Sequence, residues 1–163
     1  SFDASLFRFF QLRETDGSQV SIPSSQLILR CLTQASPEAE AALGVQDVIK
    51  IVRLRSLSDV PALFEEIYLP AFRFDGFADL PDTSFGPLLY PLYFERFSIL
   101  VRRATDDLSF ESANDMVAGQ LRLQPGDPLA VIRRTAFDVN EQPVEWRRAQ
   151  GSAAQFRYRS EIT

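Results

Sequence analysis

Two arginines and one glutamate have types and spacings that could support the binding of a charged group. Arg53 and Arg55 are two positions apart in a run rich in Val, Ile and Leu, so a strand there would place both side chains on one face. A guanidinium that is buried needs a charged partner. Glu65 could be that partner within the protein. The planar fork of arginine equally suits the carboxylate or phosphate of a bound ligand, and both alternatives stay open.

Residue types that are scarce in the chain exclude several kinds of catalysis and metal binding. The 163 residues include no histidine and one cysteine, Cys31, so Ser-His and Cys-His dyads cannot form. A transition-metal site would need oxygen ligands alone. The seven glycines lack the spacing of a phosphate-binding or dinucleotide-binding loop. Acid–base chemistry by carboxylates or tyrosine remains open. We expect no metal and no cofactor.

Composition and charge are those of one globular domain that does not itself bind DNA. Hydrophobic residues make up 45% of the chain, which is enough to bury a core, and the length corresponds to a single domain. The net charge of -5 would be repelled by a phosphate backbone. No apolar stretch approaches the ~18 residues that a membrane span needs. A lone Cys31 in an apolar run is typical of a buried thiol in a reducing cytoplasm.

Periodicity and turn residues predict strands alternating with three helices. We expect strands over 6–12, 20–32, 48–57, 62–69, 98–105, 129–137, 143–148 and 156–162, and helices over 37–43, 87–97 and 112–121. Ser36 and Ser112 are the expected N-caps, and Gly44 is expected to end the first helix. A turn centred on residues 59 and 60 would place Arg55 opposite Glu65. The aperiodic stretch 70–86 is expected to be a loop that carries function or covers the core.

Two stretches of the chain share the order helix, turn, strand, turn, strand. The first runs from Ala42 to Glu65 and the second from Gln120 to Glu145. Each has arginine on its first strand and glutamate on its second. A single unit of this kind cannot bury its apolar face alone. We expect the two units to pair their sheets about a pseudo-twofold axis and to leave a cleft against each hairpin.

A resemblance to a known family is carried by three segments in order, ALGVQDVIKIVRLRSLSDVPALFEEIYLP, LLYPLYFERF and LRLQPGDPLAVIRRTAFDVNEQPVEW. Together they resemble the UTRA domain, the effector-binding half of the HutC subgroup of GntR-type transcription regulators. The resemblance covers about residues 6–162. It implies a chorismate-lyase-like α+β fold, with an antiparallel sheet flanked by helices and built from two related helix-hairpin units. It also implies a dimeric regulator whose N-terminal winged-helix DNA-binding domain is missing from residues 1–163.

The same resemblance implies a ligand site. The ligand residues expected from it are Arg53, Arg55, Glu65, Ser84, Tyr90 and Glu145, and all of them except Ser84 match the family pattern position by position. In the family, the Arg-x-Arg pair contacts anionic groups of the effector. The helix that opens with Ser-Leu-Tyr in many members has Leu88 in place of the serine, so a hydroxyl contact would have to come from Ser84. No catalytic residue is implied.

These expectations combine into one function and two alternatives. We expect a cytoplasmic sensing domain that binds a small anionic metabolite and allosterically controls DNA binding by the attached winged-helix domain. The first alternative is a chorismate-lyase-type enzyme acting on a carboxylated small molecule, and the second is a dimerisation module without a ligand. Three phenylalanines of the central loop, Phe72, Phe74 and Phe77, are expected to be exposed and to form part of a homodimer interface.

Overall fold

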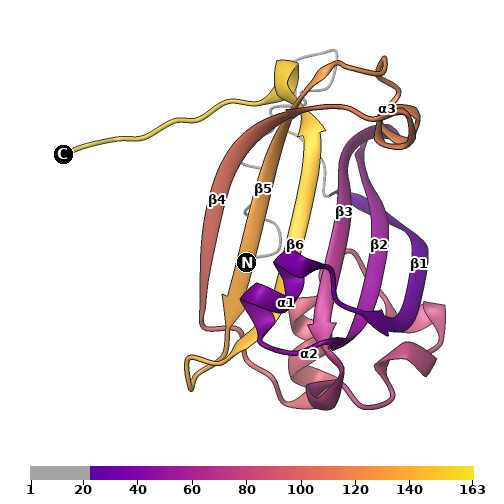
Figure 1. Cartoon of the computed structure of the whole chain (residues 1–163), viewed down its shortest axis with the longest axis vertical. Helices are drawn as coiled ribbons and strands as arrows, with labels where there is room; N and C mark the ends of the chain where they lie inside the picture. The colour runs from indigo at the N-terminus through magenta and orange to yellow at the C-terminus, as the bar shows by residue number, and fades with distance from the viewer. Residues whose placement is uncertain (1–22) are drawn as a thin grey trace.

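The fold is a single antiparallel sheet of six strands with helices on both faces, seen in a computed structural model that describes residues 23–163 (Figure 1). The strands are β1 (Ser24–Gln34), β2 (Asp47–Leu57), β3 (Val60–Pro70), β4 (Arg103–Ser112), β5 (Pro128–Phe137) and β6 (Pro143–Ser152). Their order across the sheet is β1-β2-β3-β6-β5-β4. The predicted α+β class with an antiparallel sheet is confirmed. The strand predicted over 6–12 lies outside the described residues.

The two repeated units meet at the centre of the sheet. One unit is α1 (Pro37–Leu43) followed by the β2–β3 hairpin, and the other is α3 (Asp115–Leu121) followed by the β5–β6 hairpin. Strands β3 and β6 join them, with Phe64 opposite Gln150 and Tyr68 opposite Trp146. From either edge of the sheet, the order is therefore an outer strand, then the first strand of a unit, then its second strand. This arrangement agrees with the predicted pseudo-twofold axis.

Alternation along the strands sends neighbouring residues to two different layers. On one face, Val48, Tyr68 and Trp146 pack against α1. On the other face, Ile49, Ile51, Ile67 and Leu69 pack against α2 (Tyr90–Phe97) and the chain that precedes it. Because Arg53 and Arg55 keep the parity of Ile49 and Ile51, both arginines face the α2 layer. Figure 1 shows α1 crossing the near side of the sheet and α2 at its lower end.

Local capping chemistry sets the bounds of α1 as predicted. The Ser36 hydroxyl accepts a hydrogen bond from the Ala39 N–H at 3.3 Å, and Pro37 occupies the first turn, where its missing N–H costs nothing. Gly44 ends the helix in a left-handed conformation with φ of 74°, which glycine adopts without a steric penalty.

Several boundary predictions in the second half of the chain are wrong. Helix α2 begins at Tyr90 and not at residue 87, and β6 continues to Ser152 instead of ending at residue 148. Residues 98–102 are not a strand, because Ser98 caps the end of α2 with φ of 55° and Arg103 is the first residue to pair with β5. Asn114, not Ser112, caps α3, and its side chain accepts from the Val117 N–H at 2.8 Å. Residues 157–163 form no strand, and the chain leaves the sheet as an extended arm after the short helix Ala153–Gln155 (Figure 1).

The segment between β3 and α2 covers the core with three short 3-10 helices, Ala71–Arg73, Phe77–Asp79 and Asp82–Ser84. Phe74 and Phe77 are fully buried against Tyr93 of α2, so the prediction that they are exposed at an interface is wrong. They pack because burial of aromatic rings under α2 removes apolar surface from water. Phe72 alone of the three is exposed. Cys31, predicted to be buried, is partly exposed because β1 is an edge strand.

Arg30 of β1 fastens this covering segment to the edge of the sheet. Its guanidinium donates to the Phe77 carbonyl oxygen at 3.2 Å and to Asp82 at 3.0 Å, and it lies over the Phe85 ring at 4.4 Å. The segment that leads into α2 is therefore fixed on its upstream side by a residue from β1.

Candidate functional site

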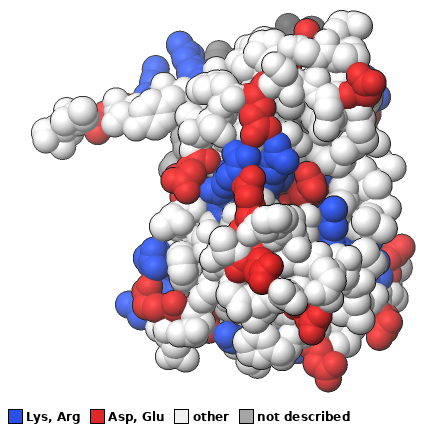
Figure 2. Space-filling model, in the orientation of Figure 1, with Lys and Arg blue, Asp and Glu red and all other residues white. Residues whose placement is uncertain are grey.

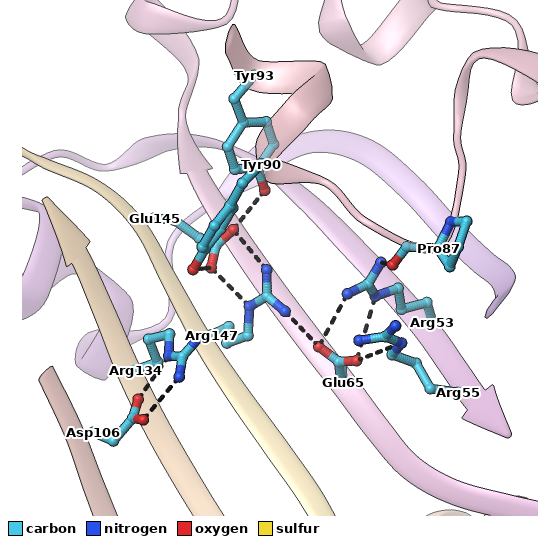
Figure 3. A network of polar contacts seen from close by, with 10 residues as sticks. All are labelled: Arg53, Arg55, Glu65, Pro87, Tyr90, Tyr93, Asp106, Arg134, Glu145 and Arg147. Atoms are coloured by element: carbon cyan, nitrogen blue, oxygen red, sulfur yellow. Dashed lines mark hydrogen bonds and ion pairs between the residues drawn. The ribbon is translucent and has the colours of Figure 1, made fainter. Parts of the chain in front are cut away.

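A buried network of charged side chains lies on the face of the sheet that α2 covers (Figure 3). It joins residues of both repeated units and of the segment that contains α2. Its members are Arg53, Arg55, Glu65, Tyr90, Tyr93, Asp106, Arg134, Glu145 and Arg147, with the carbonyl group of Pro87. Arg55, Glu65, Glu145 and Arg147 are 0% exposed, which means that their charges are held away from water.

Glu65 lies opposite Arg53, and not opposite Arg55 as predicted. The tight turn between β2 and β3 is Ser58-Asp59, with both residues at positive φ, so the register is shifted and Arg55 pairs with Leu63. The Arg53 Nη2 and Nε atoms lie 3.4 Å from the two oxygens of Glu65, and Arg55 Nε lies 3.7 Å from Oε1. Glu65 therefore faces both arginines, at distances longer than the 2.7–2.9 Å of a strong charge-assisted bond.

Arg147 is a network residue that the sequence analysis did not single out. It lies at the centre, between the two glutamates (Figure 3). Its Nη1 donates to Glu65 Oε2 at 2.9 Å, while Nε and Nη2 donate to the two oxygens of Glu145 at 2.7 and 2.9 Å. The available signal was its position two residues after Glu145 on one strand, which puts both side chains on the same face.

Helix α2 is tied to the network by two tyrosines. Tyr90 and Tyr93 are three residues apart on the helix, so both face the sheet, and their hydroxyls donate to the two oxygens of Glu145 at 3.2 and 2.5 Å. Burial and the negative charge of Glu145 raise the pKa of Tyr93 well above its ordinary range. Tyr93 is therefore a neutral hydrogen-bond donor that holds Glu145 in place.

Arg134 and Asp106 extend the network toward β4. Arg134 is almost fully buried and binds both oxygens of Asp106, at 2.7 and 2.8 Å. With this pair, the network holds four guanidinium groups and three carboxylates. The side chains together therefore carry one more positive than negative charge, and all of these charged groups except the exposed Asp106 are buried, where charges act strongly on one another.

The upstream end of the α2 segment also contacts the network. Arg53 Nη1 donates to the Pro87 carbonyl oxygen at 3.1 Å. Leu88 is half-buried beside it, in the place where the resemblance expects a serine. Ser84 lies in the 3-10 helix Asp82–Ser84, and among the described residues no hydrogen bond or ion pair joins it to the network. Of the six predicted ligand residues, the structure thus brings five together and leaves Ser84 apart.

Helix α2 and the chain before it lie over these residues, which are buried, where a cleft was predicted. A surface hollow of about 650 Å³ lies elsewhere, at the turn before β2 and the first 3-10 helix, and its lining residues are Val45, Gln46, Asp47, Ala71 and Phe72. Within residues 23–163 there is no cluster of three metal-ligating side chains. No helix in that part of the chain is long and apolar enough to cross a membrane.

A second group of charges lies on the opposite face of the sheet, next to α1. Arg133 contacts Glu38 at 2.7 Å, Ser109 at 2.9 Å and Glu111 at 2.9 Å, and Arg148 also contacts Glu111. These side chains are partly exposed, and Figure 2 shows basic and acidic groups side by side near the middle of this face. The Arg133–Glu38 contact joins α1 to the sheet, the contacts with Ser109 and Glu111 join strands, and the group is a solvated counterpart to the buried network.

Comparison with known proteins places the chain in a family. The family profile of the UTRA domain matches residues 18–157. The chain belongs to the UTRA domain family. Among solved structures, this UTRA domain is similar to the ligand-binding domain of a Bordetella bronchiseptica transcriptional regulator that is assigned to the GntR family. That structure has a TM-score of 0.81 and 25% identity over 96% of this chain and 98% of the other.

Curated relatives of this UTRA domain are transcriptional repressors. The HTH-type transcriptional repressor NagR of Bacillus subtilis is 31% identical over 122 residues, which are 72% of this chain and 49% of the repressor. A probable fructoselysine utilization operon repressor of Escherichia coli is 28% identical over 101 residues, 62% of this chain and 41% of that protein. The chain spans about half the length of these relatives or less. At the family level, the curated relatives are transcriptional regulators, and this chain corresponds to part of their length.

Proposed function

We propose that this UTRA domain senses a small anionic metabolite at the buried network and thereby changes the DNA affinity of an attached winged-helix domain. The proposal includes membership of the HutC subgroup, a domain that occupies residues 1–163, a homodimeric regulator and a cytoplasmic location. A sensor of this kind needs a coupling free energy of only ~1–3 kcal/mol between ligand and DNA. The excess of positive charge in the network is the observation that supports an anionic ligand.

Arg53 and Arg55 are the proposed anion-binding groups. Their contacts with Glu65 are 3.4 and 3.7 Å long, whereas Arg147 contacts the same carboxylate at 2.9 Å. A carboxylate or phosphate could approach the two guanidinium groups more closely than Glu65 does, because a guanidinium can bind two oxygens in a planar fork. The gain would be large, since both groups are already desolvated.

Entry of the ligand requires a local movement of the chain before α2. Pro87 contacts Arg53 through its carbonyl group, and residues 85–88 have no regular secondary structure. On either side, this stretch is held firmly, by Arg30 upstream and by the tyrosines of α2 downstream. An anion that takes the Arg53 donor from Pro87 would displace residues 85–88 and leave α2 attached through Glu145.

The relatives support small metabolites as the ligand class. Their names refer to fructoselysine utilization and, for a structure from Pseudomonas syringae with a TM-score of 0.72 and 18% identity, to histidine utilization. For this chain we propose a ligand that carries a carboxylate or a phosphate. The enzyme alternative has no comparable support, because the curated relatives are repressors.

A thermal-shift screen with acidic metabolites tests the proposal. A ligand that binds only the folded state raises the melting temperature by mass action. We expect carboxylated and phosphorylated metabolites to stabilise the wild type, and a ligand so found to lose its effect on Arg53→Ala. Arg133→Ala is the matched control, since it removes an arginine from the opposite face, and it should bind normally. Equal affinity for the wild type and Arg53→Ala would refute the proposed site.

A further inference from the structure

Glu65 is shared unequally among three guanidinium groups. Its contact with Arg147, at 2.9 Å, is a well-formed charge-assisted hydrogen bond, while its contacts with Arg53 and Arg55 are 3.4 and 3.7 Å. All of these groups are buried, so water does not screen the differences. The carboxylate is thus drawn toward the second repeated unit and away from the two arginines of its own hairpin.

Arg147 is itself fixed from the other side. Both oxygens of Glu145 accept hydrogen bonds from it, at 2.7 and 2.9 Å, and the Tyr90 ring lies 5.4 Å below its guanidinium carbon. Glu145 in turn is held by the hydroxyls of Tyr90 and Tyr93. Arg147 therefore cannot follow Glu65 toward the first hairpin, and the position of Glu65 is set by an anchored partner (Figure 3).

We propose that Arg147 is a positioning residue that raises the anion affinity of Arg53 and Arg55 by holding Glu65 away from them. The inference rests on the proposed function, because it concerns the same anion site. Arg147 makes no contact with the anion in this scheme. Its effect is electrostatic: a carboxylate that neutralises two guanidinium groups competes directly with any incoming anion.

Removal of Arg147 should lower the anion affinity of the site. Without the 2.9 Å contact with Arg147, the cationic groups next to Glu65 are Arg53 and Arg55 of β2. The Glu65 carboxylate would then move toward these two arginines. The internal ion pair would then occupy the donors that an anion needs. Anion affinity should fall, although the arginines that bind the anion are unchanged.

The test is a calorimetric titration of the protein with inorganic phosphate at constant ionic strength. The variants are Arg147→Met alone and combined with either Glu65→Gln or Glu145→Gln. The two double variants are matched, because each removes one arginine and one carboxylate and so keeps the net charge of the wild-type network. Only Glu65→Gln removes the charge that would close onto Arg53 and Arg55.

We expect Arg147→Met to weaken phosphate binding by about tenfold or more, and R147M/E65Q to recover to within about threefold of the wild type. R147M/E145Q should stay weak. Recovery in both double variants would show that net charge alone matters, and recovery in neither would assign Arg147 a purely structural role; both results overturn the inference. Should Arg147→Met fail to fold, Arg147→Lys replaces it, with a smaller loss that Glu65→Gln reverses.

The outcome for the wild type separates this inference from the proposed function. Absence of phosphate binding to the wild type, or unchanged binding to Arg53→Ala, would refute the anion site and with it the role of Arg147. Binding that is lost in Arg53→Ala but unchanged in Arg147→Met would leave the anion site intact and refute only the positioning role.

Discussion

Replacement of Tyr93 by Phe should destabilise the domain by removing one hydroxyl from the buried network. The Tyr93 hydroxyl donates to Glu145 at 2.5 Å, and the residue is 0% exposed. Hydrogen bonds to charged groups contribute about 1.5–3 kcal/mol, and the lost donor leaves a buried carboxylate less well satisfied, so we expect a loss of about 2 kcal/mol. In a chain of this length, that corresponds to a fall of about 4–8 °C in melting temperature.

Urea unfolding of the wild type and Tyr93→Phe measures this loss directly. Tyr158→Phe is the matched control, because Tyr158 is exposed on the C-terminal arm and its variant should change stability by less than about 0.5 kcal/mol. A loss below about 0.5 kcal/mol for Tyr93→Phe would refute the argument. It would mean that Arg147 and Tyr90 satisfy Glu145 without the Tyr93 hydroxyl.

The same variant has a distinct dependence on pH. The pKa of Tyr93 is raised above its ordinary value of 10.0 by burial and by Glu145, so the unfolded chain ionises at this residue before the folded protein does. The stabilisation that results is complete below pH 10 and is lost as the pH rises toward the raised pKa. Above pH 10, the stability of the wild type should therefore fall more steeply than that of Tyr93→Phe.

Three further predictions concern the supports of the site. Glu111→Gln should make the free energy of unfolding fall less steeply in acid than it does in the wild type. Hydrogen bonding to Arg133 lowers the pKa of Glu111 from 4.5, and the stabilisation that results is lost as the pH falls through the lowered pKa. Urea unfolding across pH 3–7 checks this, and parallel curves for the two proteins would contradict it. Gly44→Ala should cost about 1 kcal/mol in chemical unfolding, since φ is 74° there and no atom crowds the added Cβ; a neutral effect would contradict the capping role. Arg30→Ala should speed amide exchange over residues 77–88 and leave β6 unchanged, whereas uniform exchange would show that Arg30 does not fasten this segment.

Elements whose bounds depend on neighbouring residues were predicted correctly, whereas bounds that depend on pairing between distant strands were not. The bounds of α1 follow from Ser36, Pro37 and Gly44, which act within a few residues of one another. For α3, Ser112 and Asn114 are both good capping residues, and the choice depends on where β4 stops pairing with β5. A local pattern contains no information about that point.

Prediction of the site met the same limit. The shared face of Arg53 and Arg55 follows from alternation alone, and the structure confirms it. The partner of Glu65 depends on the register of a turn and on the pairing of β3 with β6, which joins residues 82 positions apart. Arg147 was missed for this reason, since its role arises only when the two repeated units come together.

The division of charge between the two repeated units has a consequence for how the chain folds. Taken alone, the β2–β3 hairpin would have to bury two arginines against one glutamate, and the charges of the β5–β6 hairpin are completed by Glu65 from the other unit. The Arg147–Glu65 contact is a buried ion pair between the two units, and separating the units would break it, which costs several kcal/mol. In repeat proteins with apolar interfaces, partly folded states accumulate as units detach one by one. Because the pairing of β3 with β6 and this ion pair join the two halves of the present domain, we expect them to form and melt together, in a single cooperative transition.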